Sequence, residues 1–279
     1  MTAPSQSFVA ACLQVNASND MAANIAAAAQ LTREAVAKGA DLVLMPENVA
    51  MMEWGRAAIT AKAMPEATHT ALAAFRELAK ELKIWLHGGS LAVLRDNGKV
   101  ANRTYVIAPD GSVAASYDKI HMFDVNLGNG ERYAESATFE AGSEVKYVDL
   151  PWGRLGLTIC YDLRFPHLYR QLALAGAQFL TVPSAFTQVT GEAHWHVLLR
   201  ARAIETGCFV FAPAQTGTHA GGRKTYGHAL IINPWGEVLA DAGTAPGVIM
   251  AKIDPAEVTM ARGKIPSLSL NATIHPASA

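Results

Sequence analysis

Residues 156–166 have the sequence GLTICYDLRFP, which marks a point where a buried strand turns into a helix. The apolar run at 154–158 predicts the strand, and Pro166 suits the first turn of a helix predicted over 165–175. Such a turn projects a nucleophile, here Cys160, from the sheet and points backbone N–H groups at a reacting carbonyl. The alternative is that Cys160 is a small apolar core residue, the common role of a buried cysteine. The polar flank that follows Cys160 favours the nucleophile.

Outward from this turn, short apolar runs that predict strands alternate with longer amphipathic stretches that predict helices. Strands are predicted at 8–14, 41–45, 85–89, 102–107, 146–150, 154–158, 179–182, 209–214, 229–233, 237–240 and 248–253. Helices are predicted from Asn19 or Asp20 to residue 37, and at 67–82, 165–175 and 192–206. Because the helices are too few to follow every strand, we predict an α/β fold with helices outside two mixed sheets. With no linker or repeat visible, we predict one domain over 1–279, with 266–279 as a C-terminal tail.

Composition limits the class of partner. Hydrophobic residues make up 51% of the chain and charged residues 17%, which is enough apolar material for a large core. A net charge of −1 provides no basic footprint for nucleic acid or an anionic membrane, and the apolar segments are shorter than a membrane-spanning helix needs. We therefore expect a small-molecule substrate, no nucleic-acid partner and no membrane partner.

The three cysteines are Cys12, Cys160 and Cys208, an odd set without paired spacing. This pattern argues against a disulfide framework or a zinc site and favours a reducing, cytoplasmic location. Cys12 and Cys208 lie inside apolar strand patterns, so we interpret them as structural. No cofactor is expected.

Two charged residues follow predicted strands directly. Glu47 comes after the strand at 41–45, and Lys119 begins a loop after the strand-rich segment that ends near Tyr117. Ligands bind at the carboxyl ends of strands in α/β folds, so both side chains are candidates for a site. The alternative for each is an ordinary solvated surface residue. The loop from 118 to 142 is long, and loops of that length are uncommon unless they are functional.

Other polar residues are weaker candidates. His194 and His196 suggest a metal pair, but at about 100° per residue on a helix their imidazoles point to nearly opposite sides, so we expect no metal there. Ser184, Phe186 and Thr187 follow a strand exit beside the Cys160 turn and are predicted to contribute to a substrate pocket. Arg200, Arg202 and Glu205 on the long helix are interpreted as structural ion pairs, with a dimer contact as the alternative.

From about residue 8 to residue 253 the sequence resembles the nitrilase superfamily of carbon–nitrogen hydrolases. Three motifs carry the resemblance: PEN at 46–48, YDKIH at 117–121 and CYDLRFP at 160–166. The resemblance implies a four-layer αββα sandwich that associates as a homodimer or a higher homo-oligomer. It also implies that Glu47, Lys119 and Cys160 are catalytic and that Glu135, in a Glu-Ser pair, supports the lysine.

This resemblance implies a thiol-dependent amidase. Glu47 would be the general base, Cys160 would form a thioester, and Lys119 with the Tyr161 backbone N–H would hold the oxyanion. The segments PSAF (183–186), TGEAHW (190–195), LRARAIET (199–206) and YGH (226–228) look most like the deaminated glutathione amidase branch, whose reaction releases 2-oxoglutarate and cysteinylglycine.

Three alternatives remain from the sequence. One is an omega-amidase acting on 2-oxoglutaramate, and another is a hydrolase of a different aliphatic amide or of an N-carbamoyl compound. The third, from a different class, is a non-catalytic binding or scaffold homologue. Four intact functional positions argue against the third.

Overall fold

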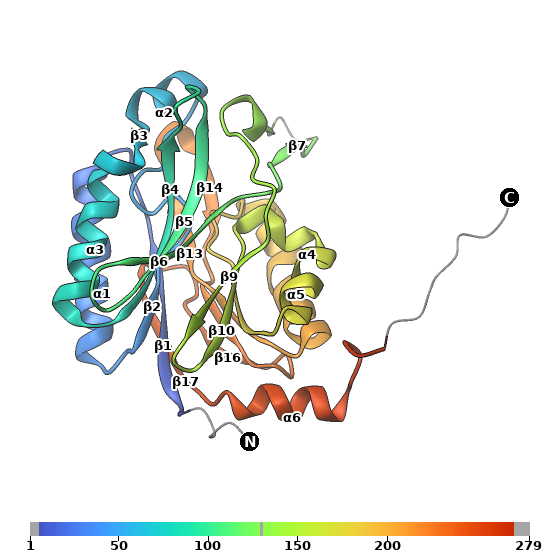
Figure 1. Ribbon diagram of the computed structural model, residues 1–279. Helices are drawn as coiled ribbons and strands as arrows, with labels where there is room; N and C mark the ends of the chain where they lie inside the picture. The colour runs from blue at the N-terminus through green and yellow to red at the C-terminus, as the bar shows by residue number, and fades with distance from the viewer. Residues whose placement is uncertain (1–5, 129–130, 271–279) are drawn as a thin grey trace, which may run out of the picture.

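Two mixed β-sheets form the centre of the computed structural model, which describes residues 6–128 and 131–270. Figure 1 shows helices α1 (Met21–Ala37) and α3 (Thr70–Leu82) outside one sheet, and α4 (Pro166–Leu174) and α5 (Gln188–Thr206) outside the other. The layers therefore follow the order helix, sheet, sheet, helix. This arrangement confirms the predicted αββα sandwich.

The larger sheet has the strand order β14-β13-β1-β2-β4-β5-β6, with β17 beside β1 and β3 beside β4. Its strands are β1 (Phe8–Val15), β2 (Leu42–Leu44), β3 (Met64–Pro65), β4 (Trp85–Leu94), β5 (Val100–Ile107), β6 (Val113–Asp118), β13 (Ala214–Thr218), β14 (Lys224–Tyr226) and β17 (Gly247–Ile253). Strands β1, β2 and β4 run parallel, so their carboxyl ends meet at one edge. Glu47 lies in the turn that follows β2 at this edge.

The smaller sheet has the order β16-β15-β12-β11-β10-β9. Its strands are β9 (Lys146–Leu150), β10 (Gly153–Leu157), β11 (Ala177–Thr181), β12 (Phe209–Ala212), β15 (Leu230–Ile232) and β16 (Val238–Asp241). Strands β10, β11 and β12 are parallel, and the Cys160 turn follows β10. The loops that follow the carboxyl ends of these strands in both sheets can therefore contribute residues to a shared site.

Alternating side chains of β1 show how the layers are held together. Ala10 and Cys12 face the second sheet, where they join a core that contains Phe179. Ala11 and Leu13 face the other way, into the layer under α1 and α3. A period of two residues places successive side chains on opposite faces of a sheet. Both faces are apolar because both are covered, and each fully buried large side chain contributes about 1.5–3 kcal/mol.

The predicted strand at 209–214 is wrong in one respect, because it divides at Pro213. Strand β12 stays in the smaller sheet, whereas β13 pairs in parallel with β1 of the larger sheet. Proline has no N–H to donate to a ladder, which favours a break at this position. The chain therefore crosses between the two sheets within two residues.

Two helices, α2 (Arg56–Lys62) and α6 (Ala256–Lys264), were not predicted. Helix α2 buries no residue, so it has no apolar stripe to reveal it. Helix α6 buries only Val258 and is attached by Arg262, whose guanidinium donates to the carbonyls of Thr206 and Ala177. The predicted start of α1 is confirmed, because the Asp20 carboxylate accepts from the Ala23 N–H.

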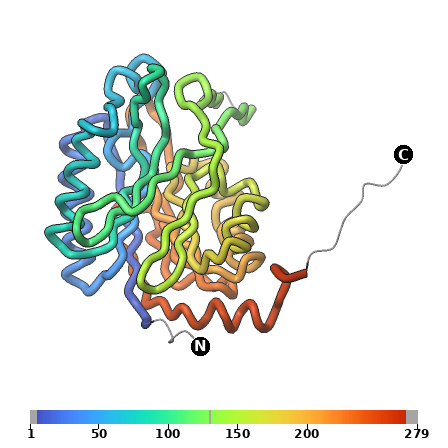
Figure 2. Tube along the Cα trace, in the orientation of Figure 1, coloured from blue at the N-terminus to red at the C-terminus, as the bar shows by residue number. Residues whose placement is uncertain are grey.

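The long loop predicted at 118–142 contains a short hairpin of β7 (Asp124–Asn126) and β8 (Arg132–Ala134). The trace in Figure 2 shows this segment, in green, at the upper right of the molecule. The loop therefore has secondary structure of its own. Of the predicted C-terminal tail, residues 271–279 lie outside the described residues. No helix in the described part of the chain has both the length and the apolar character to cross a bilayer.

Candidate active site

Cys160 stands at a strained turn between β10 and α4. It begins the short 3₁₀ helix η3 (Cys160–Arg164), and its φ of +50° lies in the left-handed region that non-glycine residues seldom adopt. The turn is fixed on both sides: the Cys160 N–H donates to the Pro183 carbonyl (3.0 Å), and the Asp162 carboxylate accepts from the Ile159 N–H (2.9 Å). Strain of this kind persists only where the surroundings determine it. The predicted strand-to-helix turn is present.

Glu47 lies beside this turn with 2% of its surface exposed. Its Oε1 accepts from the Lys119 ammonium (3.0 Å) and from the side-chain amide of Asn102 (2.9 Å), while its Oε2 accepts from the Ala185 N–H (2.9 Å). Every one of these donors comes from a different segment of the chain. The carboxylate is therefore held in one orientation by contacts from both sheets.

Lys119 is buried between two carboxylates. Its Nζ donates to Glu47 and to both oxygens of Glu135 (2.9 and 2.8 Å). Glu135 begins the 3₁₀ helix η2 (Glu135–Ala137) and also accepts from the Phe123 N–H (2.6 Å). The long loop thus closes over the lysine and supplies its second partner.

The protonation states follow from burial and from these charges. Burial disfavours the ammonium of Lys119, but the carboxylates of Glu135 and Glu47 outweigh it and raise the lysine pKa. Burial disfavours the carboxylate of Glu47, but the positive charges of Lys119 and Arg223 outweigh it and lower the glutamate pKa. Burial and then the neighbouring Glu47 raise the pKa of the Cys160 thiol. At neutral pH a protonated thiol therefore faces an ionised carboxylate to which it can pass its proton.

These groups share a cavity of ≈ 280 Å³. Its wall combines aromatic side chains with the four residues predicted to be catalytic and includes Glu47, Lys119, Glu135, Cys160, Tyr161, Phe186, Thr187, Phe123, Tyr133, Trp54 and Arg223. Tyr161, Phe186 and Thr187, which were predicted from the sequence to make the substrate and oxyanion contacts, line this cavity.

Ser184 requires a correction. It is fully buried, its hydroxyl donates to the Val182 carbonyl (3.0 Å), and it is not among the residues that line the cavity. Its backbone connects to the segment that enters β13 instead, because the Ser184 N–H donates to the Pro213 carbonyl (3.0 Å) and the Ser184 carbonyl accepts from the Gln215 N–H (2.8 Å). Ser184 therefore joins the two sheets and does not face the pocket.

Two residues of the site were missed. Asn102 is 1% exposed and donates to Glu47 (2.9 Å) and to Glu135 (3.4 Å). Arg223 lines the cavity and donates through Nη2 to the Ala185 carbonyl (2.6 Å), while its Nε is buried without a hydrogen-bond partner. Within residues 6–128 and 131–270 no acidic side chain forms an ion pair with Arg223. A polar side chain inside an apolar strand pattern was a usable signal for Asn102, whereas Arg223 follows two glycines that suggested only a flexible loop.

An αββα sandwich that brings a cysteine, a carboxylate and an ammonium to one cavity has the architecture of a thiol hydrolase. The family model for carbon-nitrogen hydrolases matches residues 9–262, so the chain belongs to the carbon–nitrogen hydrolase family. The predictions that the chain belongs to the nitrilase superfamily and is an amidase are confirmed at this level.

Relatives of known name or structure support this assignment. The deaminated glutathione amidase of Synechocystis sp. is 43% identical over 268 residues, which are 94% of this chain and 97% of that protein. The crystal structure of the NitFhit protein of C. elegans matches with a TM-score of 0.90 at 38% identity and covers 96% of this chain, which spans 66% of that chain. The structure of Saccharomyces cerevisiae Nit3, described as a member of branch 10 of the nitrilase superfamily, matches with a TM-score of 0.85 at 29% identity, over 94% and 96% of the two chains.

Proposed function

We propose that this chain hydrolyses deaminated glutathione to 2-oxoglutarate and cysteinylglycine through a thioester on Cys160. The observation that carries the proposal is the cavity in which Cys160, Glu47 and Lys119 meet beside Arg223, whose buried Nε has no hydrogen-bond partner. The Synechocystis relative named deaminated glutathione amidase, which aligns with 94% of this chain, supports the choice of substrate.

In the first step Glu47 accepts the proton of the Cys160 thiol, and the sulfur attacks the amide carbonyl. The raised pKa of the thiol and the lowered pKa of the carboxylate place the proton on sulfur before substrate binds. Transfer of this proton is therefore coupled to the attack. A fully ionised thiolate need not exist in the free enzyme.

The attack turns the carbonyl oxygen into an oxyanion. The ammonium of Lys119, kept charged by Glu135, and the Tyr161 N–H are the proposed donors to this oxyanion. Protonated Glu47 then gives its proton to the leaving nitrogen, so the carbon–nitrogen bond breaks and cysteinylglycine departs as a neutral amine.

Hydrolysis of the thioester uses the same groups in the reverse sense. Glu47, again ionised, takes a proton from water, and the hydroxide attacks the acyl carbon. When the carbon–sulfur bond breaks, the proton returns from Glu47 to the Cys160 sulfur. The products are 2-oxoglutarate and the regenerated enzyme, with one water consumed.

Arg223 is the proposed partner of a substrate carboxylate. Deaminated glutathione carries a carboxylate next to its keto group and another on its glycine, whereas a simple aliphatic amide carries none. A guanidinium binds a carboxylate with charge-assisted hydrogen bonds, and a buried Nε without a partner costs free energy until such a ligand arrives. The Tyr133 ring lies beside this guanidinium, with its centroid 5.5 Å from Arg223 Cζ, and Phe186 and Tyr161 also line the cavity.

The direct test compares kcat/KM for deaminated glutathione and for 2-oxoglutaramate, with release of 2-oxoglutarate as the readout. We expect the former to be preferred and Cys160→Ala to abolish both activities. A strong preference for 2-oxoglutaramate would refute the proposed substrate while leaving the thioester chemistry intact. Normal turnover by the Cys160→Ala variant would refute the mechanism.

A second variant tests the carboxylate partner. Arg223→Gln should raise KM for deaminated glutathione by about 10–100-fold, because a charge-assisted hydrogen bond contributes about 1.5–3 kcal/mol. Arg76→Gln is the matched control, since Arg76 also donates to a backbone carbonyl (Gly111, 2.8 Å) but is not among the residues that line the cavity. Equal KM values for the parent and the Arg223 variant would remove Arg223 from substrate recognition.

We also propose that the chain forms a homodimer through the outer face of α5. Val189, Val197 and Ile204 are exposed on this helix (47%, 69% and 51%) and lie within about 80° of one another around its axis. Trp235, 56% exposed, extends the apolar surface. Light scattering should find a dimer for the parent and a monomer for Val197→Glu, while Val113→Glu on β6 should remain dimeric. A monomeric parent would refute this interface.

A cytoplasmic location remains our proposal for the compartment. It is supported by the three cysteines, all of which are buried and unpaired. Fractionation of the producing cells should recover the activity with the cytoplasmic marker enzymes, and recovery in an oxidising compartment would contradict the proposal.

A further inference from the structure

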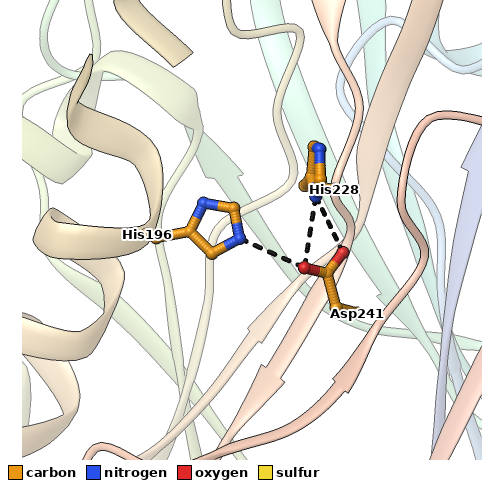
Figure 3. Close-up of side chains that lie close together, drawn as sticks. All are labelled: His196, His228 and Asp241. Atoms are coloured by element: carbon orange, nitrogen blue, oxygen red, sulfur yellow. Dashed lines mark hydrogen bonds and ion pairs between the residues drawn. The ribbon is translucent and has the colours of Figure 1, made fainter. Parts of the chain in front are cut away.

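Outside the cavity, three side chains from separate elements converge at one end of the smaller sheet (Figure 3). His196 comes from α5, His228 from the turn between β14 and β15, and Asp241 from the end of β16. Figure 3 shows both imidazoles directed at the Asp241 carboxylate. Among the residues that the structure describes, this is the one group of three histidine, cysteine or acidic side chains whose donor atoms come within 4.8 Å of one another.

The distances between the donor atoms suit a metal ion. Asp241 Oδ2 lies 3.2 Å from His196 Nε2 and 3.2 Å from His228 Nδ1. In a tetrahedral site with bonds of about 2.0–2.1 Å, neighbouring donor atoms are about 3.3 Å apart. Two of the three donor separations therefore already have the required length, and the donor atoms of all three residues lie within 4.8 Å of one another.

The cluster is held in place by contacts that leave the donor atoms facing inward. His228 has a φ of +53°, and its backbone is bonded on both sides: its N–H donates to Gly243 (2.7 Å), and its carbonyl accepts from the Trp195 indole (2.7 Å). Asp241 Oδ1 accepts from the Gly243 N–H (2.8 Å), and the Tyr226 ring stacks on the His228 imidazole at 4.5 Å. Left-handed backbone at a non-glycine residue costs free energy and persists where the surroundings determine it. Such supporting contacts orient ligands before an ion binds.

An ion can reach the cluster from solvent. The side chains of His196 and Asp241 are each 34% exposed, and that of His228 is 22% exposed. Three protein ligands with one open side leave a coordination position for water.

The structure agrees with the interpretation that His194 and His196 do not act as a pair, since His194 Nδ1 faces the Arg164 guanidinium instead (3.3 Å). The partners of His196 come from residues 32 and 45 positions further along the chain.

We propose that His196, His228 and Asp241 bind one divalent transition-metal ion per chain, with zinc as its representative. Two imidazole nitrogens and a single carboxylate match zinc and its neighbours in the first transition series, whereas magnesium and calcium prefer sites built from oxygen. The ion connects α5 to the edge strand β16 and to the turn after β14. This site is separate from the proposed catalytic cavity and does not depend on the substrate.

Calorimetric titration with zinc chloride tests the proposal. The parent for this titration is the Cys160→Ser variant, because an active-site thiol can itself bind zinc. We expect one ion per chain, and we expect His196→Ala and Asp241→Asn each to weaken binding by at least ~100-fold, since loss of even a supporting contact typically costs 10–100-fold. His194→Ala is the matched control from the same helix and should bind as the parent does. Magnesium should not bind.

Cobalt provides a second readout that does not depend on affinity. The cobalt complex should show only the weak bands of nitrogen and oxygen ligands, without the intense charge-transfer band that a thiolate produces, and His196→Ala should remove them. Circular dichroism shows whether each variant is folded, and His196→Gln replaces His196→Ala if the alanine variant is not. Absence of binding to the parent, binding unchanged in both ligand variants, or an equal loss in His194→Ala would each overturn the proposal.

Discussion

Replacement of Glu135 by glutamine isolates the part that charge plays in holding Lys119. Glu135 accepts two hydrogen bonds from the Lys119 ammonium at 2.9 and 2.8 Å, and one from the Phe123 N–H. Glutamine has nearly the same shape and keeps an oxygen for one of these donors. The substitution therefore removes a negative charge with little change in packing.

The structure sets the size of the effect. Unit charges separated by 2.8 Å attract by about 6 kcal/mol at an effective dielectric constant of ~20. A neutral hydrogen bond from glutamine restores about 1 kcal/mol of this. Glu47 remains as a partner, so Lys119 stays protonated near neutral pH but binds its proton less tightly. With the ammonium less firmly placed, kcat should fall by about 10–100-fold, below the ~10²–10³ expected when an oxyanion donor is lost altogether.

The pH dependence gives the sharper readout. In the parent, the neighbouring carboxylates raise the pKa of Lys119, so the ammonium persists into the alkaline range. In Glu135→Gln the lysine should lose its proton at lower pH, and kcat/KM should decline at less alkaline pH than in the parent. Initial rates of 2-oxoglutarate release across the neutral and alkaline range measure this directly.

Glu140→Gln is the control. Glu140 pairs with Arg95 (2.7 Å) and Lys99 (3.3 Å), and it is not among the residues that line the cavity. The same chemical change at this position should leave the rate and the pH profile as in the parent. If Glu135→Gln also kept the parental kcat/KM and the parental alkaline limb, then Glu135 would have no role in charging or placing Lys119.

Three further outcomes are expected. Iodoacetamide should modify Cys160 before Cys12 and Cys208, because the latter two are 0% exposed, and Glu47→Gln should slow the labelling of Cys160. Peptide mass spectrometry measures the labelling of each cysteine, and equal labelling of all three would contradict this prediction. Gly191→Ala should lower Tm although alanine favours helices by about 1 kcal/mol, because the added methyl overlaps Cβ and Cγ of Tyr226 and overpacking costs about 1–3 kcal/mol. Burial lowers the pKa of His87 to about 4, so the unfolded chain binds more protons below pH 6.5 and His87 should contribute a loss of about 2 kcal/mol of stability from pH 7 to pH 5. Urea midpoints should show a smaller loss in His87→Gln than in the parent, with the remainder coming from His69 and His219, whose pKa values burial also lowers; an equal loss in both proteins would contradict this.

Buried strands were predictable from the sequence because their apolar runs are short and are bounded by turn residues. Strand β9 occupies the predicted interval, and helix α5 ends where Gly207, with a φ of +58°, was expected to end it. The pattern could not show that β12 and β13 belong to different sheets, since both are apolar and only pairing with distant strands separates them. Helix α6 escaped notice because its anchor is Arg262, a charged residue whose partners are backbone carbonyls far away in the sequence.

In the candidate site too, some residues could be predicted from the sequence pattern and others depend on tertiary packing. Glu47, Lys119 and Cys160 follow β2, β6 and β10, and ligands bind at the carboxyl ends of strands in α/β folds, so the sequence predicted that these three residues belong to one site. Asn102 contacts Glu47 and Glu135, and Arg223 lines the cavity, but neither follows the end of a strand. Asn102 projects from the interior of β5, and Arg223 reaches Ala185 only because β14 folds back on β13. Chain direction therefore places the groups proposed to carry the reaction, whereas tertiary packing places those that orient them and that are proposed to select the substrate. A family resemblance accordingly transfers the chemistry to this chain more securely than it transfers the substrate.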